Sequence, residues 1–183
     1  MEKTSGIKNT LVYWLAVEIY YLNYIFIERY LWRGSRTFDQ MEQAGRSGKQ
    51  DLAEGAEENS TESNLKLSGV SRASYAELVE DYQDFLWTKK LPVWDKNDPR
   101  TTRLRKILIN THETHVSHES NEWHGISFDD PEAFANLMIT LCTKQGFLMD
   151  RFLQGIEKSF VEKGGFRENL FRKWREFQKK QNL

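Results

Sequence analysis

The chain has 183 residues, enough for one domain with a core of its own. Its formal net charge of −1 excludes a field over the whole molecule that would attract nucleic acid or an anionic membrane, so any such binding must be local. The single cysteine, Cys142, excludes an internal disulfide and fits a reducing compartment, so we expect a cytoplasmic protein.

Composition predicts an all-α fold. Eleven Phe, seven Tyr and six Trp occur in a chain whose mean hydropathy is −0.69, so large apolar faces must alternate with densely charged ones, as they do in amphipathic helices. The three prolines all lie in the second half of the chain, and no run of β-branched residues alternates as a strand would.

The first predicted helix spans residues 10–32 and is apolar on almost all sides. One line along it carries Leu11, Leu15 and Leu22, and tyrosines and branched residues cover much of the rest. A surface helix needs only one apolar face, so the second face must be buried by a partner or by the rest of the chain. Because a four-helix bundle has no central helix, we favour self-association over burial within one chain.

The same segment resembles a membrane anchor in one respect, because apolar residues crowd together after a basic start. Glu18, Asn23, Glu28 and Arg29 interrupt it before it reaches the roughly 20 apolar residues of a membrane span. No small-residue cleavage site follows it. We therefore expect neither a membrane span nor a signal peptide.

The second predicted helix starts near Thr37 or Asp39, either of which could cap it, and runs past Glu54. Its inner line is nearly bare of side chains and consists of Met41, Gly45, Gly48, Leu52 and Gly55. Glycine costs about 1 kcal/mol per helix position relative to alanine, so three of them on one line predict close backbone approach or a local kink. A phosphate-binding loop would need a preceding strand, so we do not expect one at residues 45–49.

The third predicted helix begins at a cap on Ser60 or Thr61 and reaches Lys90. The expected core stripe of this helix is Leu67, Val70, Ser74, Leu78, Tyr82 and Phe85. Small residues beside that stripe favour tight helix contact over a ligand cavity, so we expect no pocket here.

Two Asp-Pro pairs predict the starts of further helices, because aspartate caps a helix and proline fits its first turn. Asp98-Pro99 opens a short helix with Leu104, Ile107 and Leu108 expected inward. Asp130-Pro131 opens a helix of about 33 residues, about 50 Å long, that ends at Gly164-Gly165.

The last segment, residues 166–183, predicts a basic amphipathic helix separate from a main domain at residues 1–165. Its expected apolar face consists of Phe166, Leu170, Trp174 and Phe177. Charge is polarised along the chain: residues 39–84 have four basic and eleven acidic side chains, whereas residues 151–183 have nine basic and four acidic. Local binding of phosphates is therefore expected at the C-terminal end.

Several short motifs resemble a known family. They are Asp39-Gln40-Met41, Arg46-Ser47-Gly48-Lys49-Gln50, Ala53-Glu54-Gly55 and Gly164-Gly165. With them, residues 11–167 resemble the four-helix-bundle proteins of the 23S rRNA intervening-sequence type, in the branch called the four helix bundle suffix domain. The resemblance implies an up-down antiparallel four-helix bundle, a homopentamer and no established reaction.

A more distant resemblance is to the accessory variability determinant of diversity-generating retroelements. That protein is similar in fold and uses a basic surface to bind nucleic acid and a reverse transcriptase, although it is strongly basic and this chain is not. The resemblance implies a non-enzymatic, self-associating adaptor that binds RNA, DNA or a nucleic-acid enzyme such as a reverse transcriptase. A protein-protein scaffold without nucleic-acid contact is the alternative.

The residues expected at a nucleic-acid or partner interface are mostly cations. They are Arg46, Lys49, Arg100, Arg103, Arg105, Lys106, Arg167, Arg172, Lys173, Trp174, Arg175 and Lys179. For Arg46 and Lys49, together with Glu54, an ion-pair set across helices or subunits is the favoured interpretation, and a basic rim for nucleic acid is the alternative. In the last helix, packing on the chain's own bundle is an equal alternative to binding a partner.

The four histidines fall in one short stretch, at His112, His115, His118 and His124. Zinc or nickel accepts such ligands, and a spacing of three would align the first three on a helix. No cysteine accompanies them, so we favour a solvated connector over a metal site. No arrangement of nucleophile, base and acid stands out, so we expect neither an enzyme nor a cofactor.

Overall fold

The computed structural model describes residues 6–58, 60–114, 116–117 and 119–181. Helices make up most of this part of the chain, as the sequence predicts. The elements are η1 (Gly6–Asn9), α1 (Leu11–Tyr30), α2 (Arg36–Glu57), α3 (Thr61–Thr88), α4 (Pro99–Arg105), β1 (Glu122–Trp123), β2 (Ile126–Ser127), α5 (Pro131–Lys163) and α6 (Phe166–Gln181). The two short strands pair as an antiparallel hairpin.

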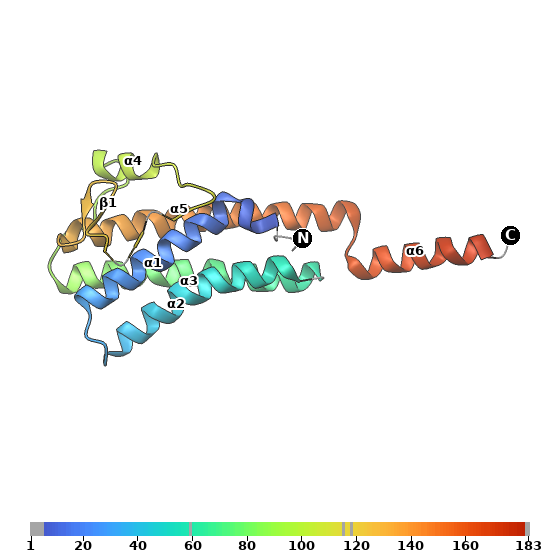
Figure 1. Ribbon diagram of the computed structural model, residues 1–183, viewed down its shortest axis with the longest axis horizontal. Coiled ribbons are helices and arrows are strands. Elements are labelled where there is room, and N and C mark those ends of the chain that lie inside the picture. Colours follow the sequence, from blue (N-terminus) through green and yellow to red (C-terminus); the bar gives the residue numbers. More distant parts are fainter. Residues whose placement is uncertain (1–5, 59, 115, 118, 182–183) are drawn as a thin grey trace.

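Four long helices form the main part of the molecule, which we call the helical body. In it, α1 contacts α2 and α5, and α3 contacts the same two helices. Successive long helices run in opposite directions along the long axis, whereas α6 extends beyond the end of α5 and away from the helical body (Figure 1). No helix in the described part of the chain is long and apolar enough to cross a membrane.

Helix starts follow local capping chemistry. Asp98 and Asp130 cap α4 and α5, each followed by a proline in the first turn, and Ser60 caps α3, all as predicted. α2 begins at Arg36, close to the expected start, but the predicted cap at Thr37 or Asp39 is wrong, because the Ser35 hydroxyl accepts a hydrogen bond from the Phe38 N–H at 3.1 Å.

The core stripe of α3 differs from the predicted one at Val70, whose side chain is 46% exposed. Small hydroxyl residues line the buried face beside the aromatic ones, and the Ser71 hydroxyl donates to the Gly48 carbonyl oxygen of α2 at 2.6 Å. The inward prediction for Leu108 is also wrong. Leu104 is buried, but Leu108 lies beyond the end of α4 and is 90% exposed.

The second apolar face of α1 is covered by the chain itself. The segment between α4 and α5 contributes Val116, Trp123, Ile126 and Phe128 to the same buried core as α1. This is the burial within one chain that the sequence argument set aside. Self-association therefore no longer follows from the apolar character of α1.

The glycines on the inner line of α2 are buried as predicted, and neighbouring side chains fill the space above them. A Cβ on Gly45 would lie 2.7 Å from Asn23 Nδ2, and one on Gly48 would lie 2.8 Å from Tyr75 Cζ. Asn23 donates to the Met41 carbonyl oxygen at 2.8 Å and accepts from the Tyr82 hydroxyl at 2.6 Å. At these two glycines the close approach is thus between the α2 backbone and large side chains of α1 and α3.

Candidate nucleic-acid interface

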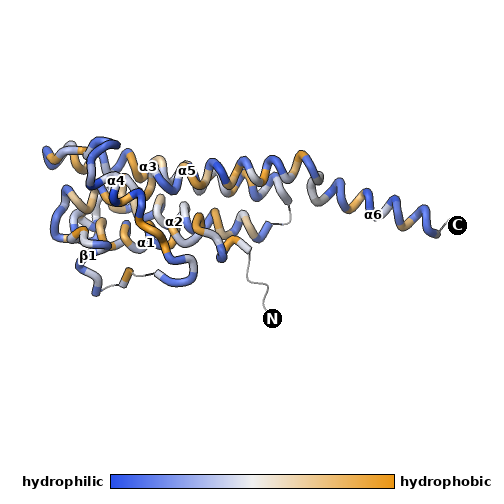
Figure 2. The backbone as a smooth tube through the Cα atoms, turned by 90° about the horizontal axis from the view of Figure 1, so that it is seen from above, coloured by the Kyte–Doolittle hydropathy of each residue, from blue (hydrophilic) through white to orange (hydrophobic). Residues whose placement is uncertain are grey.

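The predicted interface residues lie in three separate places. Arg46 and Lys49 are on α2, residues 100–106 are at α4, and the rest are on α6. Figures 1 and 2 place α4 and α6 toward opposite ends of the long axis. One chain therefore does not bring the α4 cations and the α6 cations into a single binding surface.

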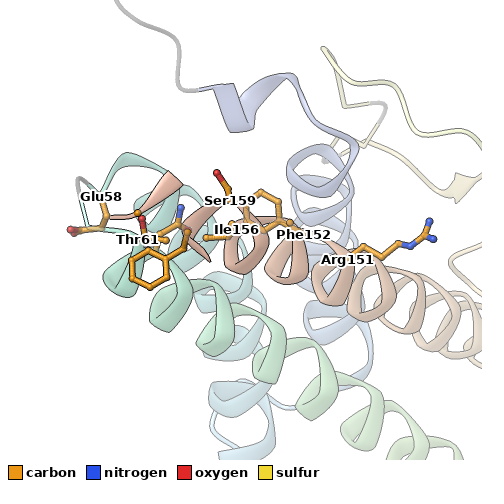
Figure 3. A pocket seen from close by; sticks show the side chains of 10 residues that line it. Glu58, Thr61, Arg151, Phe152, Ile156 and Ser159 are labelled. Carbon is orange, nitrogen blue, oxygen red and sulfur yellow. The ribbon is translucent and has the colours of Figure 1, made fainter. Parts of the chain in front are cut away.

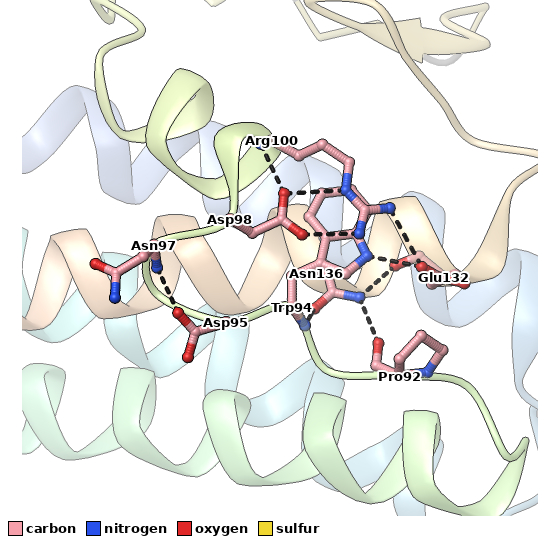
Figure 4. A network of polar contacts seen from close by, with 8 residues as sticks. All are labelled: Pro92, Trp94, Asp95, Asn97, Asp98, Arg100, Glu132 and Asn136. Carbon is pink, nitrogen blue, oxygen red and sulfur yellow. Dashed lines mark hydrogen bonds and ion pairs between the residues drawn. The ribbon is translucent and has the colours of Figure 1, made fainter.

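Arg100 belongs to a polar network with neighbouring side chains, and its own side chain is 53% exposed (Figure 4). Its guanidinium lies 3.9 Å from the centre of the Trp94 ring and donates to Asp98 Oδ2 at 2.8 Å. This hydrogen bond lowers the pKa of Asp98. Trp94 Nε1 in turn donates to Glu132 Oε1 at 2.7 Å, and the Trp94 N–H donates to Asn136 Oδ1 at 2.7 Å. Arg100 thus helps to fasten the segment before α4 to α5.

The other predicted cations at α4 are all exposed, and one of them also makes a structural contact. Arg105 donates to the Lys96 carbonyl oxygen at 2.9 Å, which closes the loop that precedes α4. Arg103 and Lys106 are exposed. Sequence reasoning missed Lys144 of α5, whose ammonium donates to the carbonyl oxygens of Arg105 and Ile107 at 3.2 and 2.8 Å. Sequence spacing carries no signal for that contact, because it depends on how α4 lies on α5.

Arg46 and Lys49 have partners other than the predicted ion pairs. Lys49 Nζ lies 3.7 Å from the centre of the Tyr20 ring, and burial, followed by the neighbouring Arg46 charge, lowers the pKa of Lys49. Arg46 donates to Gln50 Oε1 at 3.2 Å, and Gln50 donates to Glu54 Oε1 at 2.7 Å. Within the described residues, neither Arg46 nor Lys49 forms an ion pair across helices, and an ion pair across subunits stays a prediction.

The helix α6 has six basic and two acidic side chains. Its basic side chains that were predicted at the interface are all exposed. The Phe171 and Trp174 rings stack with their centres 5.7 Å apart, and Arg175 Cζ lies 5.9 Å from the Phe171 centre. The aromatic side chains are more than half exposed, at 58% for Phe171 and 54% for Trp174. An exposed aromatic pair among cations is the chemistry that stacks on nucleobases and holds phosphates.

The junction between α5 and α6 sets the direction of α6. Gly164 has φ 73°, which favours glycine, and its N–H donates to the Phe160 carbonyl oxygen at the end of α5. Asn169 Nδ2 donates to the carbonyl oxygens of Gly164 and Gly165 at 3.2 and 2.9 Å. One side chain thus ties the first turn of α6 to both glycines of the junction.

Apolar and basic residues occupy different faces of α6. Residues seven apart share a face, so Leu170 lies in line with Phe177, and Arg172 lies in line with Lys179. Residues two apart are separated by about 200° around the axis, so the Arg172–Lys179 line is opposite the Leu170–Phe177 line. Figure 2 shows apolar and polar positions recurring along the whole of α6.

Surface depressions border the helical body, among them two that involve α3. One, of about 570 Å³, lies between the start of α3 and the end of α5. Figure 3 shows side chains that line it, among them Thr61, Phe152 and Ile156. The second, about 810 Å³, lies between α2 and α3 over Ala44, Ser47 and Ala73. The expectation of no pocket along α3 is therefore wrong, because small side chains on both helices leave an open groove above their contact.

The histidine prediction is only partly covered by the structure. His115 and His118 lie outside the described residues. His112 follows α4 in an irregular segment, and the His124 ring lies 4.3 Å from that of Trp123 in the hairpin turn. Among the described residues, no group of three His, Cys, Asp or Glu side chains is arranged to hold a metal ion. The solvated connector stays the prediction for this stretch, and the metal site stays its alternative.

No protein-family model, curated protein or solved structure matches the chain.

Proposed function

We propose that this chain is a non-enzymatic, self-associating cytoplasmic adaptor that binds single-stranded RNA through α6. The observation that carries the proposal is the exposed stack of Phe171 on Trp174 within a basic helix that extends away from the helical body. The cyclic contacts of α1, α2, α3 and α5 support an up-down four-helix bundle as the scaffold. The proposal includes the resemblance of residues 11–167 to the four-helix-bundle proteins of the 23S rRNA intervening-sequence type.

Phosphate contacts would come from one row of α6. Arg172, Arg175 and Lys179 are spaced by three and four residues, so they follow one face over about 10 Å. None of the three forms an ion pair within the described residues, so a phosphate would not have to displace a carboxylate. Each contact would release counterions from the nucleic acid, which makes binding depend on salt.

The aromatic pair favours single strands over duplexes. Bases in a duplex are stacked on one another, whereas bases of a single strand are free to stack on protein rings. The Phe171 ring lies 5.9 Å from Arg175 Cζ of the basic row and stacks on Trp174, and both rings are more than half exposed. A strand whose phosphates follow that row would therefore have its bases within reach of the two rings.

A scaffold without nucleic-acid contact is the second candidate. It is favoured by the exposure of Leu170 and Phe177, each 56%, on the face of α6 opposite the basic row. An amphipathic helix commonly places such a face in an apolar groove of a partner. A partner protein, including a nucleic-acid enzyme, would bury this face and leave the basic row in solvent.

A binding measurement with a fluorescent oligouridine RNA distinguishes the RNA-binding adaptor from the scaffold. We expect the wild type to raise the anisotropy of the RNA, and Arg172→Glu with Arg175→Glu and Lys179→Glu to weaken binding at least tenfold. The matched control carries the same charge change at the exposed Lys66, Lys89 and Lys96. Equal losses in both variants would show that net charge alone governs binding. Absence of RNA binding by the wild type would favour the scaffold.

A further inference from the structure

The apolar face of α6 has no counterpart on its own helical body. Leu170, Trp174 and Phe177 lie on one face at spacings of four and three residues, and each is more than half exposed. The helix begins at the far end of α5 and continues outward (Figure 1). Burial of this face therefore requires another molecule, or another copy of this one.

The groove between α2 and α3 has a shape and charge that suit such a helix. Its floor consists of small side chains, among them Ala44 and Ala73, and Val70 adds exposed apolar surface. Four carboxylates and one guanidinium line it. These are Asp39, Glu77, Glu80, Asp81 and Arg36. A small-residue floor lets a helix approach closely, and the acidic rim favours a basic one.

The dimensions of the two surfaces agree. The groove follows residues 36–47 of α2 and residues 70–81 of α3, which is about 17 Å along each helix. Residues 170–180 of α6 cover about 15 Å. Lys173 and Lys180 follow Leu170 and Phe177 by three residues each, so both lie along one edge of the apolar face. In the groove these lysines would meet the carboxylates of the rim.

We propose that α6 of one chain lies in the α2–α3 groove of a second copy, with Leu170, Trp174 and Phe177 on the floor and Lys173 and Lys180 at the acidic rim. This inference rests on the self-association in the proposed function and supplies its interface. The two surfaces differ, so the contact is head-to-tail and repeats from copy to copy, which produces a closed ring or an open chain.

The carboxylates of the rim support the same arrangement. Burial raises the pKa of Asp81, and the charges of Asp84, Glu77 and Glu80 raise it further. Asp39 and the Arg36 guanidinium of α2 line the groove opposite these groups. A crowded set of carboxylates is stabilised by an incoming cation, and the lysines of α6 would supply two.

A charge-reversal exchange tests the interface. The helix variant carries Lys173→Glu and Lys180→Glu, and the groove variant carries Glu77→Lys and Glu80→Lys, all at exposed positions. Light scattering after size exclusion, without nucleic acid, should give a multiple of 21.7 kDa for the wild type. Each variant alone should associate at least tenfold more weakly, and an equimolar mixture should regain assembly because each altered surface meets its complement.

Three outcomes would overturn the proposal: a wild type of 21.7 kDa at every concentration, single variants that assemble as the wild type does, or a mixture that does not assemble. Lys89→Glu with Lys96→Glu is the control and should leave the mass unchanged. Circular dichroism of each variant verifies folding. The helix variant keeps Arg172, Arg175 and Lys179, so failure of assembly and failure of RNA binding are distinguishable in one protein.

Discussion

The Trp123 indole N–H donates a hydrogen bond to the buried Glu18 carboxylate at 3.2 Å and so joins the β1–β2 hairpin to the middle of α1. Two further contacts follow the same side of α1: the Tyr30 hydroxyl donates to the Phe128 carbonyl oxygen at 2.5 Å, and Arg29 pairs with Asp129 at 2.5 Å. The segment before α5 is therefore a structural cover for α1.

Trp123→Phe should destabilise the protein by about 1–3 kcal/mol, because a buried carboxylate loses a hydrogen-bond donor. Urea unfolding followed by circular dichroism measures the change in free energy. Trp87→Phe is the matched control, since Trp87 is 80% exposed, and it should change stability by less than about 0.5 kcal/mol. Equal effects of the two substitutions would contradict the covering role of the hairpin.

Gly48→Ala and Gly69→Ala should have opposite signs. The added methyl group at Gly48 meets the Tyr75 ring, so we expect a loss of about 1–3 kcal/mol from overpacking. At Gly69 a Cβ has nothing within 4 Å, so alanine should gain up to about 1 kcal/mol from its better helix propensity. Thermal unfolding of both variants measures the two changes in stability. A stabilising Gly48→Ala would contradict the contact of α2 with Tyr75.

Two aspartates should respond to pH in opposite directions. The pKa of Asp81 is raised from 3.8, so its ionised form costs stability above the folded pKa, and the cost disappears as the pH falls. The pKa of Asp150 is lowered from 3.8 by hydrogen bonding to Arg72, so its ionised form adds stability that is lost as the pH falls through the folded pKa.

At pH 7, Asp81→Asn should therefore raise the melting temperature and Asp150→Asn should lower it. Each effect should stay within about 1 kcal/mol, because both groups are near the surface. The Asp81→Asn difference should disappear as the pH falls below 3.8, and the Asp150→Asn difference should shrink as the pH falls from 3.8 through the lower folded pKa. Effects of the same sign at pH 7 would refute these assignments.

RNA and self-association should compete for Trp174, because the ring cannot both stack on a base and lie in the groove of a neighbour. Adding an oligouridine RNA should lower the number of protein chains in each assembly. Light scattering with and without RNA measures this number, and Trp174→Ala should weaken both kinds of binding. RNA that binds tightly without any change in assembly size would show that the two surfaces are independent.

Local signals in the sequence predicted much of the fold. The pairs Asp98-Pro99 and Asp130-Pro131 mark helix starts within a few residues, and Gly164 marks the end of α5, because capping depends on neighbours in the chain. Such local signals do not predict contacts between distant segments of the chain. The Arg100 contact with Glu132 depends on how the segment around α4 lies on α5.

At the candidate site, too, local sequence signals predicted some features, and contacts between distant segments were missed. The spacing of apolar and basic residues on α6 predicted an amphipathic helix, which the structure confirms. The cations at residues 100–106 and those of α6 were both predicted at the interface. No signal in the sequence indicated that these two elements lie far apart (Figure 1). The groove between α2 and α3 was missed because Val70 was assigned to the core, and only packing shows it to be exposed.

RNA binding at the Arg172–Lys179 row is the central claim, and its salt dependence is the most direct test. Three phosphate contacts to a single strand predict that log K falls with log salt concentration with a slope of about −2. The variant with Arg172, Arg175 and Lys179 changed to Glu should bind weakly with a slope near zero. A slope in the wild type that this triple change leaves intact, or no binding at low salt, would contradict the account.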